Sequence, residues 1–170
     1  MKRILSLVLA IISVALVMVG FCACDGSSNN NNNGGDGAKA GTFGIVYKNV
    51  VVELDKNAKS ILSALGAPEE EKNVADCGTG PRKRYTYNDI EIYTVEVNGT
   101  EKIDEINLTN DLISTSKGIS IGSSEADVRE AYGNPSSEAN GRLIYSKSGL
   151  ELIFNIKNGE VGSIKYNKRA

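Results

Sequence analysis

The 170-residue sequence has no histidine and no tryptophan, and only three cysteines and three prolines. Histidine is the side chain most often used for general acid–base catalysis and the commonest metal ligand, so its absence removes the usual centre of many enzyme and metal-site classes. Lys and Arg total 19 against 21 Asp and Glu, and the one basic cluster is Arg82 to Arg84. Nucleic-acid binding requires more clustered positive charge than this. We therefore expect no catalysis, no metal, no cofactor and no nucleic-acid partner.

The first 24 residues have the pattern of an export signal rather than of a fold element. Two basic residues precede an uncharged, mostly apolar run, residues 4–21, and Cys22 and Cys24 follow it. The run is long enough to cross a bilayer as a helix. An uncleaved membrane anchor and ordinary secretion are therefore the alternatives to a cleaved and lipidated signal.

The residues Phe21-Cys22-Ala23-Cys24 resemble the lipobox of bacterial lipoproteins, in which a small residue precedes a cysteine that is diacylated before the signal is removed. Phe21 stands where the family usually has leucine. The resemblance implies a signal peptide at residues 1–23, lipidation of Cys24, and attachment to the extracytoplasmic face of the bacterial cell membrane. The partner at this end is the lipid bilayer, because two acyl chains give stable anchoring where one gives only marginal anchoring.

Residues 24–42 are rich in Asn, Gly and Ser, and this composition buries too little to offset its ordering entropy. It predicts a flexible tether. Cys77 is the one cysteine in the remaining chain, so the folded part contains no internal disulfide. Its thiol is either reactive, which requires a pKa lowered by a nearby cation or a helix N-terminus, or a half-buried structural residue.

Two stretches of the remaining sequence share one order of features, and such repeats determine architecture. Residues 51–110 contain a helix pattern ending in LGAP at 65–68, a strand with tyrosines, and an Asn-Gly turn at 98–99. Residues 118–167 contain a helix pattern ending in YGNP at 132–135, Tyr145, and an Asn-Gly turn at 158–159. Asn-Gly is the pair that favours a type I′ hairpin. Asp55 is the expected cap of the first helix, and Ser124 with Asp127 forms a capping box for the second.

We therefore expect an α+β fold of two tandem repeats, residues 43–112 and 113–170, each a short helix packed on a three- to four-stranded antiparallel sheet. Both helices are too short to be stable alone and must pack on strands. The alternation of apolar and polar residues over 150–156 indicates a sheet with one buried face and one open face.

The stretch "GSSEADVREAYGNP … LIYSKSGLELIFNIKNGEVGSIKY" resembles the repeat of the β-lactamase inhibitory protein fold and of small lipoproteins of outer-membrane assembly. It is nearer still to a group of uncharacterised two-repeat lipoproteins of Gram-positive bacteria. The resemblance implies a helical layer beside a curved antiparallel sheet whose open face receives a partner protein. No residue matches an inhibitor's contact residues.

Seven tyrosines suggest a binding surface, because tyrosine is common in interfaces. Tyr85 and Tyr87 share one strand face by the two-residue period, and Tyr93 and Tyr145 fall on neighbouring or equivalent strands. These four residues are the candidate surface, and the alternative is that they lie at the edge of the core. The expected function is a protein-binding or envelope-assembly module with an envelope protein as partner. The alternatives are a carrier of a small ligand, such as a peptide or cell-wall fragment held in a pocket between the repeats, and a spacer without a partner.

Overall fold

The computed structural model describes residues 38–75 and 81–169. The expected signal peptide, the lipidation site Cys24, most of the expected tether and Cys77 lie outside these ranges. Within the described ranges, no helix is long and apolar enough to span a membrane.

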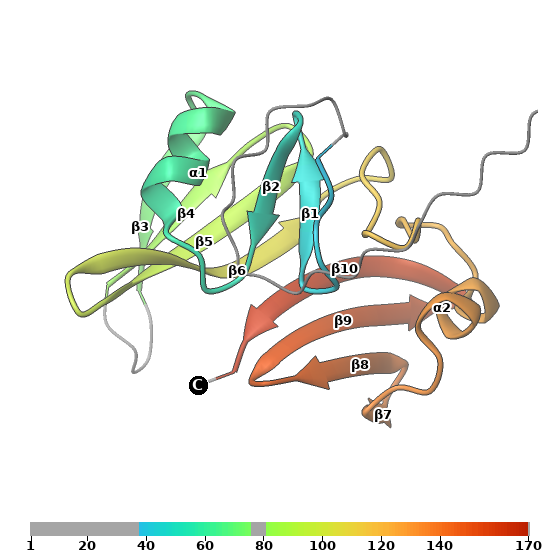
Figure 1. Cartoon of the computed structure of the whole chain (residues 1–170). Helices are drawn as coiled ribbons and strands as arrows, with labels where there is room; N and C mark the ends of the chain where they lie inside the picture. Colours follow the sequence, from blue (N-terminus) through green and yellow to red (C-terminus); the bar gives the residue numbers. More distant parts are fainter. Residues whose placement is uncertain (1–37, 76–80, 170) are drawn as a thin grey trace, which may run out of the picture. The chain divides into compact units, whose positions relative to one another are not determined.

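Eight strands form one continuous antiparallel sheet in the order β3-β4-β5-β6-β10-β9-β8-β7 (Figure 1). Two halves of the chain contribute four strands each. The first half supplies β3 (Glu70–Val74), β4 (Arg82–Thr86), β5 (Ile90–Val97) and β6 (Thr100–Leu108). The second half supplies β7 (Ser137–Ala139), β8 (Arg142–Lys147), β9 (Leu150–Lys157) and β10 (Glu160–Lys168). The halves meet where β6 pairs with β10, with Ile106 opposite Tyr166.

The expectation of two repeats, each a helix on its own small sheet, is wrong. The protein is mostly β, with two helices of eight residues each among the described residues and a single large sheet. Two separate sheets would each leave the edge of a long strand, β6 or β10, with unpaired N–H and C=O groups. Pairing those two edges satisfies the groups, and it joins two units of about 60 residues that would each bury too little surface alone.

A β-hairpin that the sequence did not predict covers part of one sheet face. Strands β1 (Gly44–Tyr47) and β2 (Val50–Glu53) form a two-stranded sheet whose turn, Lys48-Asn49, has positive φ at both residues. The helices α1 (Ala58–Leu65) and α2 (Glu125–Tyr132) lie on the same side of the large sheet as this hairpin (Figure 1). All three contribute to one hydrophobic core, through residues such as Ile45, Val52, Ala58 and Val128.

The ends of the helices and the turns follow local chemistry closely. The capping box of α2 is confirmed, because the Ser124 hydroxyl accepts from the Asp127 N–H and the Asp127 carboxylate accepts from the Ser124 N–H. The cap of α1 is Asn57, whose side chain accepts from the Lys59 N–H at 3.0 Å, and not Asp55 as predicted. Both predicted Asn-Gly turns, at 98–99 and 158–159, have positive φ at each residue.

Asp55 instead ties the segment before α1 to the middle of the sheet. Its carboxylate accepts from Lys168 at 2.6 Å and from Lys102 at 3.2 Å, so it links β10 and β6 across the joint between the halves. The hydrogen bond from Lys168 is the main reason that the pKa of Asp55 lies below its ordinary value, with a further contribution from Lys102.

We expect Asp55→Asn to cost up to about 1 kcal/mol of unfolding free energy at neutral pH, because both ion pairs are partly exposed. Asparagine tolerates the positive φ of 62° found here. Because the pKa of Asp55 is lower in the folded state, its ion pairs stabilise the fold fully above the ordinary aspartate pKa. This stabilisation is lost as the pH falls through the lower folded-state pKa. Denaturant titrations of both proteins at neutral and acidic pH test this. A difference that persists unchanged in acid would contradict it.

Candidate functional site

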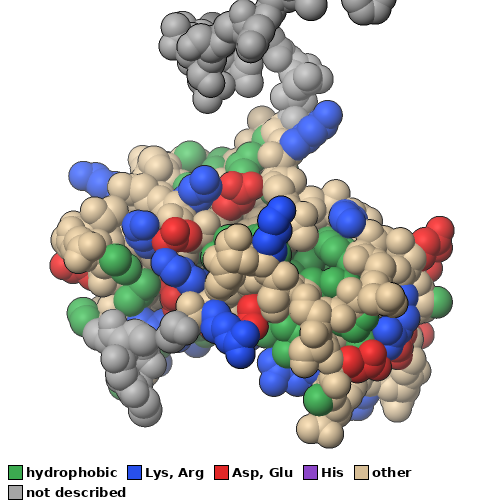
Figure 2. Space-filling model, turned by 60° about the horizontal axis from the view of Figure 1, so that its bottom comes forward, with side chains coloured by type: hydrophobic (Ala, Val, Ile, Leu, Met, Phe, Trp, Pro, Cys, Tyr) green, Lys and Arg blue, Asp and Glu red, His purple; other side chains and the backbone are tan. Residues whose placement is uncertain are grey.

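The sheet has one covered face and one open face. Side chains alternate along each strand, and those that point toward α1, α2 and the hairpin form the core. The other set forms what we call the open face, which no described helix or hairpin covers. Figure 2, in which the bottom of the view in Figure 1 is turned forward, shows basic and acidic side chains interspersed with hydrophobic ones on the surface of the molecule.

Three of the four tyrosines in the predicted surface are core residues. Tyr85, Tyr87 and Tyr145 are 6%, 2% and 7% exposed. The two-residue period correctly placed Tyr85 and Tyr87 on one face of β4 and the turn that follows it, but that face is the covered one. The two-residue period of a strand shows that two residues share a face. It does not show which face is buried when both faces of the strand carry amphipathic side chains.

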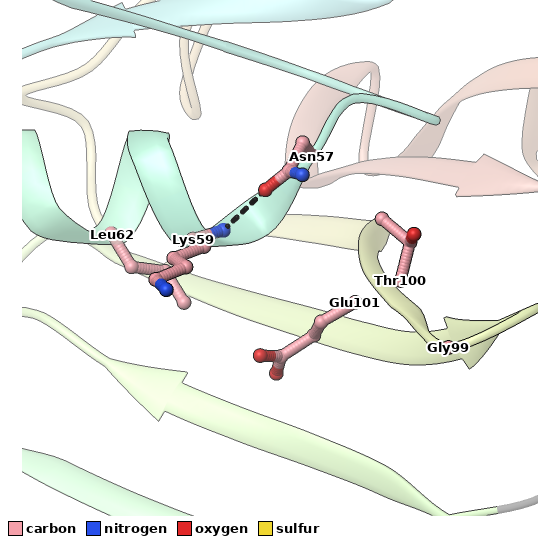
Figure 3. A pocket seen from close by; sticks show the side chains of 6 residues that line it. All are labelled: Asn57, Lys59, Leu62, Gly99, Thr100 and Glu101. Atoms are coloured by element: carbon pink, nitrogen blue, oxygen red, sulfur yellow. Dashed lines mark hydrogen bonds between the residues drawn. The ribbon is translucent and has the colours of Figure 1, made fainter.

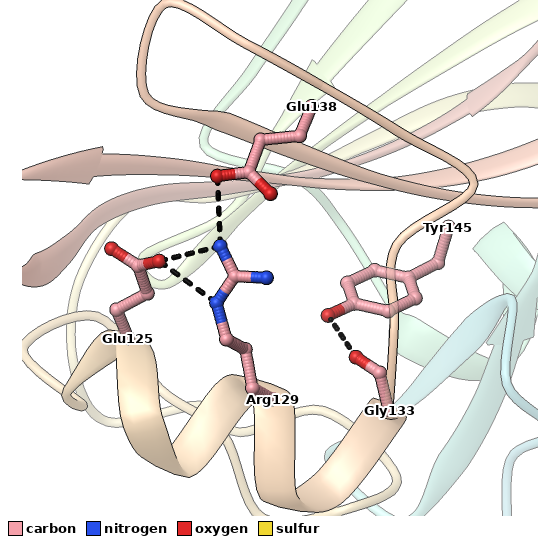
Figure 4. Close-up of polar contacts among 5 residues, drawn as sticks. All are labelled: Glu125, Arg129, Gly133, Glu138 and Tyr145. Atoms are coloured by element: carbon pink, nitrogen blue, oxygen red, sulfur yellow. Dashed lines mark hydrogen bonds and ion pairs between the residues drawn. The ribbon is translucent and has the colours of Figure 1, made fainter.

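Two of these tyrosines perform the same structural task in the two halves. The Tyr87 hydroxyl donates to the carbonyl of Gly66 at 3.2 Å, and the Tyr145 hydroxyl donates to the carbonyl of Gly133 at 3.0 Å (Figure 4). Each glycine is the C-cap of a helix. Each tyrosine therefore fastens the end of one helix to the sheet. Beside this contact, Arg129 of α2 pairs with Glu125 and with Glu138 of β7, at 2.7 and 2.8 Å (Figure 4).

Tyr93 is the one residue of the four predicted surface tyrosines that lies on the open face. It is opposite Arg84 on β4 and Glu105 on β6. The Arg82 guanidinium lies 5.2 Å from the centre of its ring, and its hydroxyl donates to Glu91 at 3.2 Å. Burial raises the pKa of its phenol, so the hydroxyl stays protonated at neutral pH.

Carboxylates around Tyr93 hold Arg82 in place. A β-bulge opposite Tyr93 leaves Asp104 without a cross-strand partner, next to Glu105. Arg82 contacts Asp104 at 2.8 Å and Glu105 at 3.6 Å, and the side chains of Arg82 and Asp104 are 18% and 19% exposed. Burial raises the pKa of Asp104, and the positive charge of Arg82 acts against this rise. Lys165 on β10 adds a contact with Glu105 at 2.9 Å.

A second ion-paired group lies beside the first. Arg84 contacts Glu70 on β3 at 2.6 Å and Glu91 on β5 at 3.7 Å. The Nε atoms of Arg82 and Arg84 are buried without a hydrogen-bond partner. The open face over β3 to β6 and β10 is thus a surface of mixed charge around one aromatic ring. In the sequence, Arg82 to Arg84 form a basic cluster, and the sequence does not show the acidic residues that neighbouring strands bring to Arg82 and Arg84.

The open face presents paired charges around one aromatic ring. In the described part of the chain, no group of three His, Cys, Asp or Glu side chains is placed to hold a metal ion. The carboxylates on the open face are engaged by Arg and Lys, and no nucleophile is paired with a base there. The alternative of a ligand pocket between the sheets of two repeats does not apply to the described residues, because the two halves share a single large sheet.

Comparison with known proteins adds little. No protein-family model matches the chain, and no curated protein matches it. Among solved structures, a cysteine-rich secretory protein from Staphylococcus aureus subsp. aureus Mu50 aligns with 68% of this chain and 43% of its own, at 12% identity and a TM-score of 0.38. The chain thus spans less than half the length of that protein. A likeness at this score supports no conclusion about fold or function.

Proposed function

We propose that this protein is a membrane-anchored, extracytoplasmic binding module that takes a partner protein on the open face of its sheet. Anchoring rests on the lipobox at Cys24, with residues 25–42 as a spacer between the bilayer and the fold. The observation that carries the binding proposal is the cluster of Tyr93, Arg82 and Asp104 on a sheet face that no described element covers.

The composition of this cluster suits a protein interface. Tyrosine and arginine, together with tryptophan, are enriched among the residues that dominate binding energy. Arg82 and Arg84 are held by carboxylates before any partner arrives, which lowers the entropy cost of ordering them on association. Because both charge signs are present, the complementary partner surface carries acidic and basic groups in a matching arrangement, and this favours specificity over general attraction.

The absence of histidine from the whole sequence and the pairing of the open-face carboxylates support a non-catalytic role. Binding by a tethered domain requires no chemistry on the partner. The proposal therefore concerns recognition alone, with an envelope protein as the partner class.

Site-specific cross-linking in cells tests the proposal. We expect a photoreactive phenylalanine analogue in place of Tyr93 in the full-length, anchored protein to cross-link to one discrete partner. The same analogue in place of Leu112, which is 73% exposed on the linker between β6 and α2, serves as the matched control and should not capture that partner. Arg82→Lys, which keeps the charge but loses the planar guanidinium, should weaken the cross-link from position 93 several-fold.

Equal capture of the same proteins from positions 93 and 112 would count against the open face as the binding surface. So would a cross-link from position 93 that Arg82→Lys leaves unchanged, because the contact would then not depend on the cluster that carries the proposal.

A further inference from the structure

A polar cluster interrupts the covered face of the sheet in the first half of the chain. Glu101 on β6 accepts two hydrogen bonds on its Oε1 atom, from the Tyr85 hydroxyl at 2.9 Å and from the Thr94 hydroxyl at 2.6 Å. Thr94 is 1% exposed and is one of two buried polar residues among those described. Burial and the bond to Glu101 raise the pKa of Tyr85 to about 12, so Tyr85 remains a donor at any physiological pH. The two donors fix the position of the Glu101 carboxylate.

The second half of the chain has no such cluster at the equivalent place. The halves can be aligned through Tyr87 and Tyr145, which fasten equivalent helix ends, and through matching bulges in β6 and β10. This alignment places Leu143, Ile156 and Gly159 where the first half has Tyr85, Thr94 and Glu101. The second half therefore has apolar residues, Leu143 and Ile156, at two of these positions. The polar cluster is a specific feature of the first half.

The first half also extends its hairpin beyond the point where the second half turns. β9 and β10 turn at Asn158-Gly159, directly after the pair Lys157 and Glu160. β5 and β6 continue past the equivalent pair, through Glu96 opposite Glu101 and Val97 opposite Thr100, before turning at residues 98–99. This extension stands beside α1 and makes one wall of a groove.

The groove lies between the start of α1 and the extended hairpin, with a volume of about 410 Å³ (Figure 3). Its lining is Asn57, Lys59, Leu62, Gly99, Thr100 and Glu101. Lys59 reaches it from the helix and the Glu101 carboxylate from the strand, so a cation and an anion border one space with an apolar side chain beside them. The groove is open to solvent and has room for a small molecule.

We propose that this groove binds an α-amino-acid or short-peptide zwitterion, with the ligand ammonium on Glu101 and the ligand carboxylate on Lys59. Oε1 of Glu101 is occupied by its two donors, and no hydrogen bond from a described residue reaches Oε2. That oxygen is therefore the acceptor for the ammonium. Leu62 contacts the ligand side chain. The site lies on the covered side of the sheet, so it does not depend on the open face or on the function proposed above.

The test is titration of the full-length protein in detergent micelles with L-alanine and with L-alanyl-L-alanine, followed by amide NMR. We expect shifts centred on Gly99 and Thr100, and tighter binding of the dipeptide, which fills more of the groove. Glu101→Gln keeps an acceptor for Tyr85 and Thr94 but removes the charge, so the fold persists and the dissociation constant rises about tenfold or more. Lys59→Gln should also weaken binding. Glu130→Gln, an exposed acid on α2, is the matched control and should leave binding unchanged.

Acetylating the amino group of the dipeptide should abolish binding, and amidating its carboxyl group should reproduce the loss seen with Lys59→Gln. The proposal is overturned if neither probe shifts Gly99 or Thr100 at millimolar concentration. It is also overturned if Glu101→Gln binds as tightly as the wild type, or if the acetylated dipeptide does.

Discussion

Replacing Tyr166 with alanine is expected to lower the free energy of unfolding by about 3–5 kcal/mol, the range for truncating a large buried aromatic side chain. Tyr166 is fully buried and lies on β10, opposite Ile106 of the first half and Leu152 of the second. The cavity would therefore open at the joint between the halves, where neither half can close it by moving alone. Denaturant unfolding followed by circular dichroism measures the change. A loss below about 1 kcal/mol would show that the ring does not pack as described.

The matched variant Tyr166→Phe separates packing from hydrogen bonding. The Tyr166 hydroxyl is buried without a hydrogen-bond partner, and burial raises the pKa of its phenol well above the ordinary value. Removing an unsatisfied buried hydroxyl is neutral or stabilising. We therefore expect Tyr166→Phe to be at least as stable as the wild type. A loss of about 1 kcal/mol or more would mean that the hydroxyl has a partner in solution.

Local chemistry made one helix start and two turns predictable from sequence, but not the cap of α1, which is Asn57 and not Asp55. The capping box at Ser124 and the Asn-Gly turns at 98–99 and 158–159 are confirmed, because each depends on residues within a few positions of one another. The β1–β2 hairpin was missed, although Lys48-Asn49 adopts the same positive φ angles as Asn-Gly. Lysine gives no turn signal of its own, so only the paired strands reveal the turn.

Long-range pairing was the part that sequence could not supply. The repeated order of features predicted two separate helix-on-sheet repeats, and nothing in the sequences of β6 and β10 indicates that these two strands pair with each other in one sheet. The same limit applies to the candidate site. Arg82, Tyr93 and Asp104 come from three different strands. They meet only because of the strand register and one bulge. Nothing in the sequence indicates that Glu101 belongs to a polar cluster, because its hydrogen-bond donors lie 7 and 16 residues away on other strands.

Lys165→Pro tests whether the two halves form one folding unit. Lys165 lies in the interior of β10, between Asn107 of β6 and Ile153 of β9. Proline removes a ladder hydrogen bond there and is poorly tolerated in a central strand, so we expect a loss of about 3 kcal/mol or more. Lys165→Ala, which removes only the partly exposed ion pair with Glu105, should cost about 1 kcal/mol or less.

The decisive measurement is hydrogen exchange at Ile92 and Ile106, which belong to the first half. In a continuous sheet, weakening β10 removes the neighbour of β6, so both amides should lose protection together with those of β9. Two independent repeats would instead leave Ile92 and Ile106 protected while the second half opens. That result would contradict the pairing of β6 with β10. It would also contradict the shared core at this joint, where Tyr166 lies opposite Ile106 of the first half and Leu152 of the second.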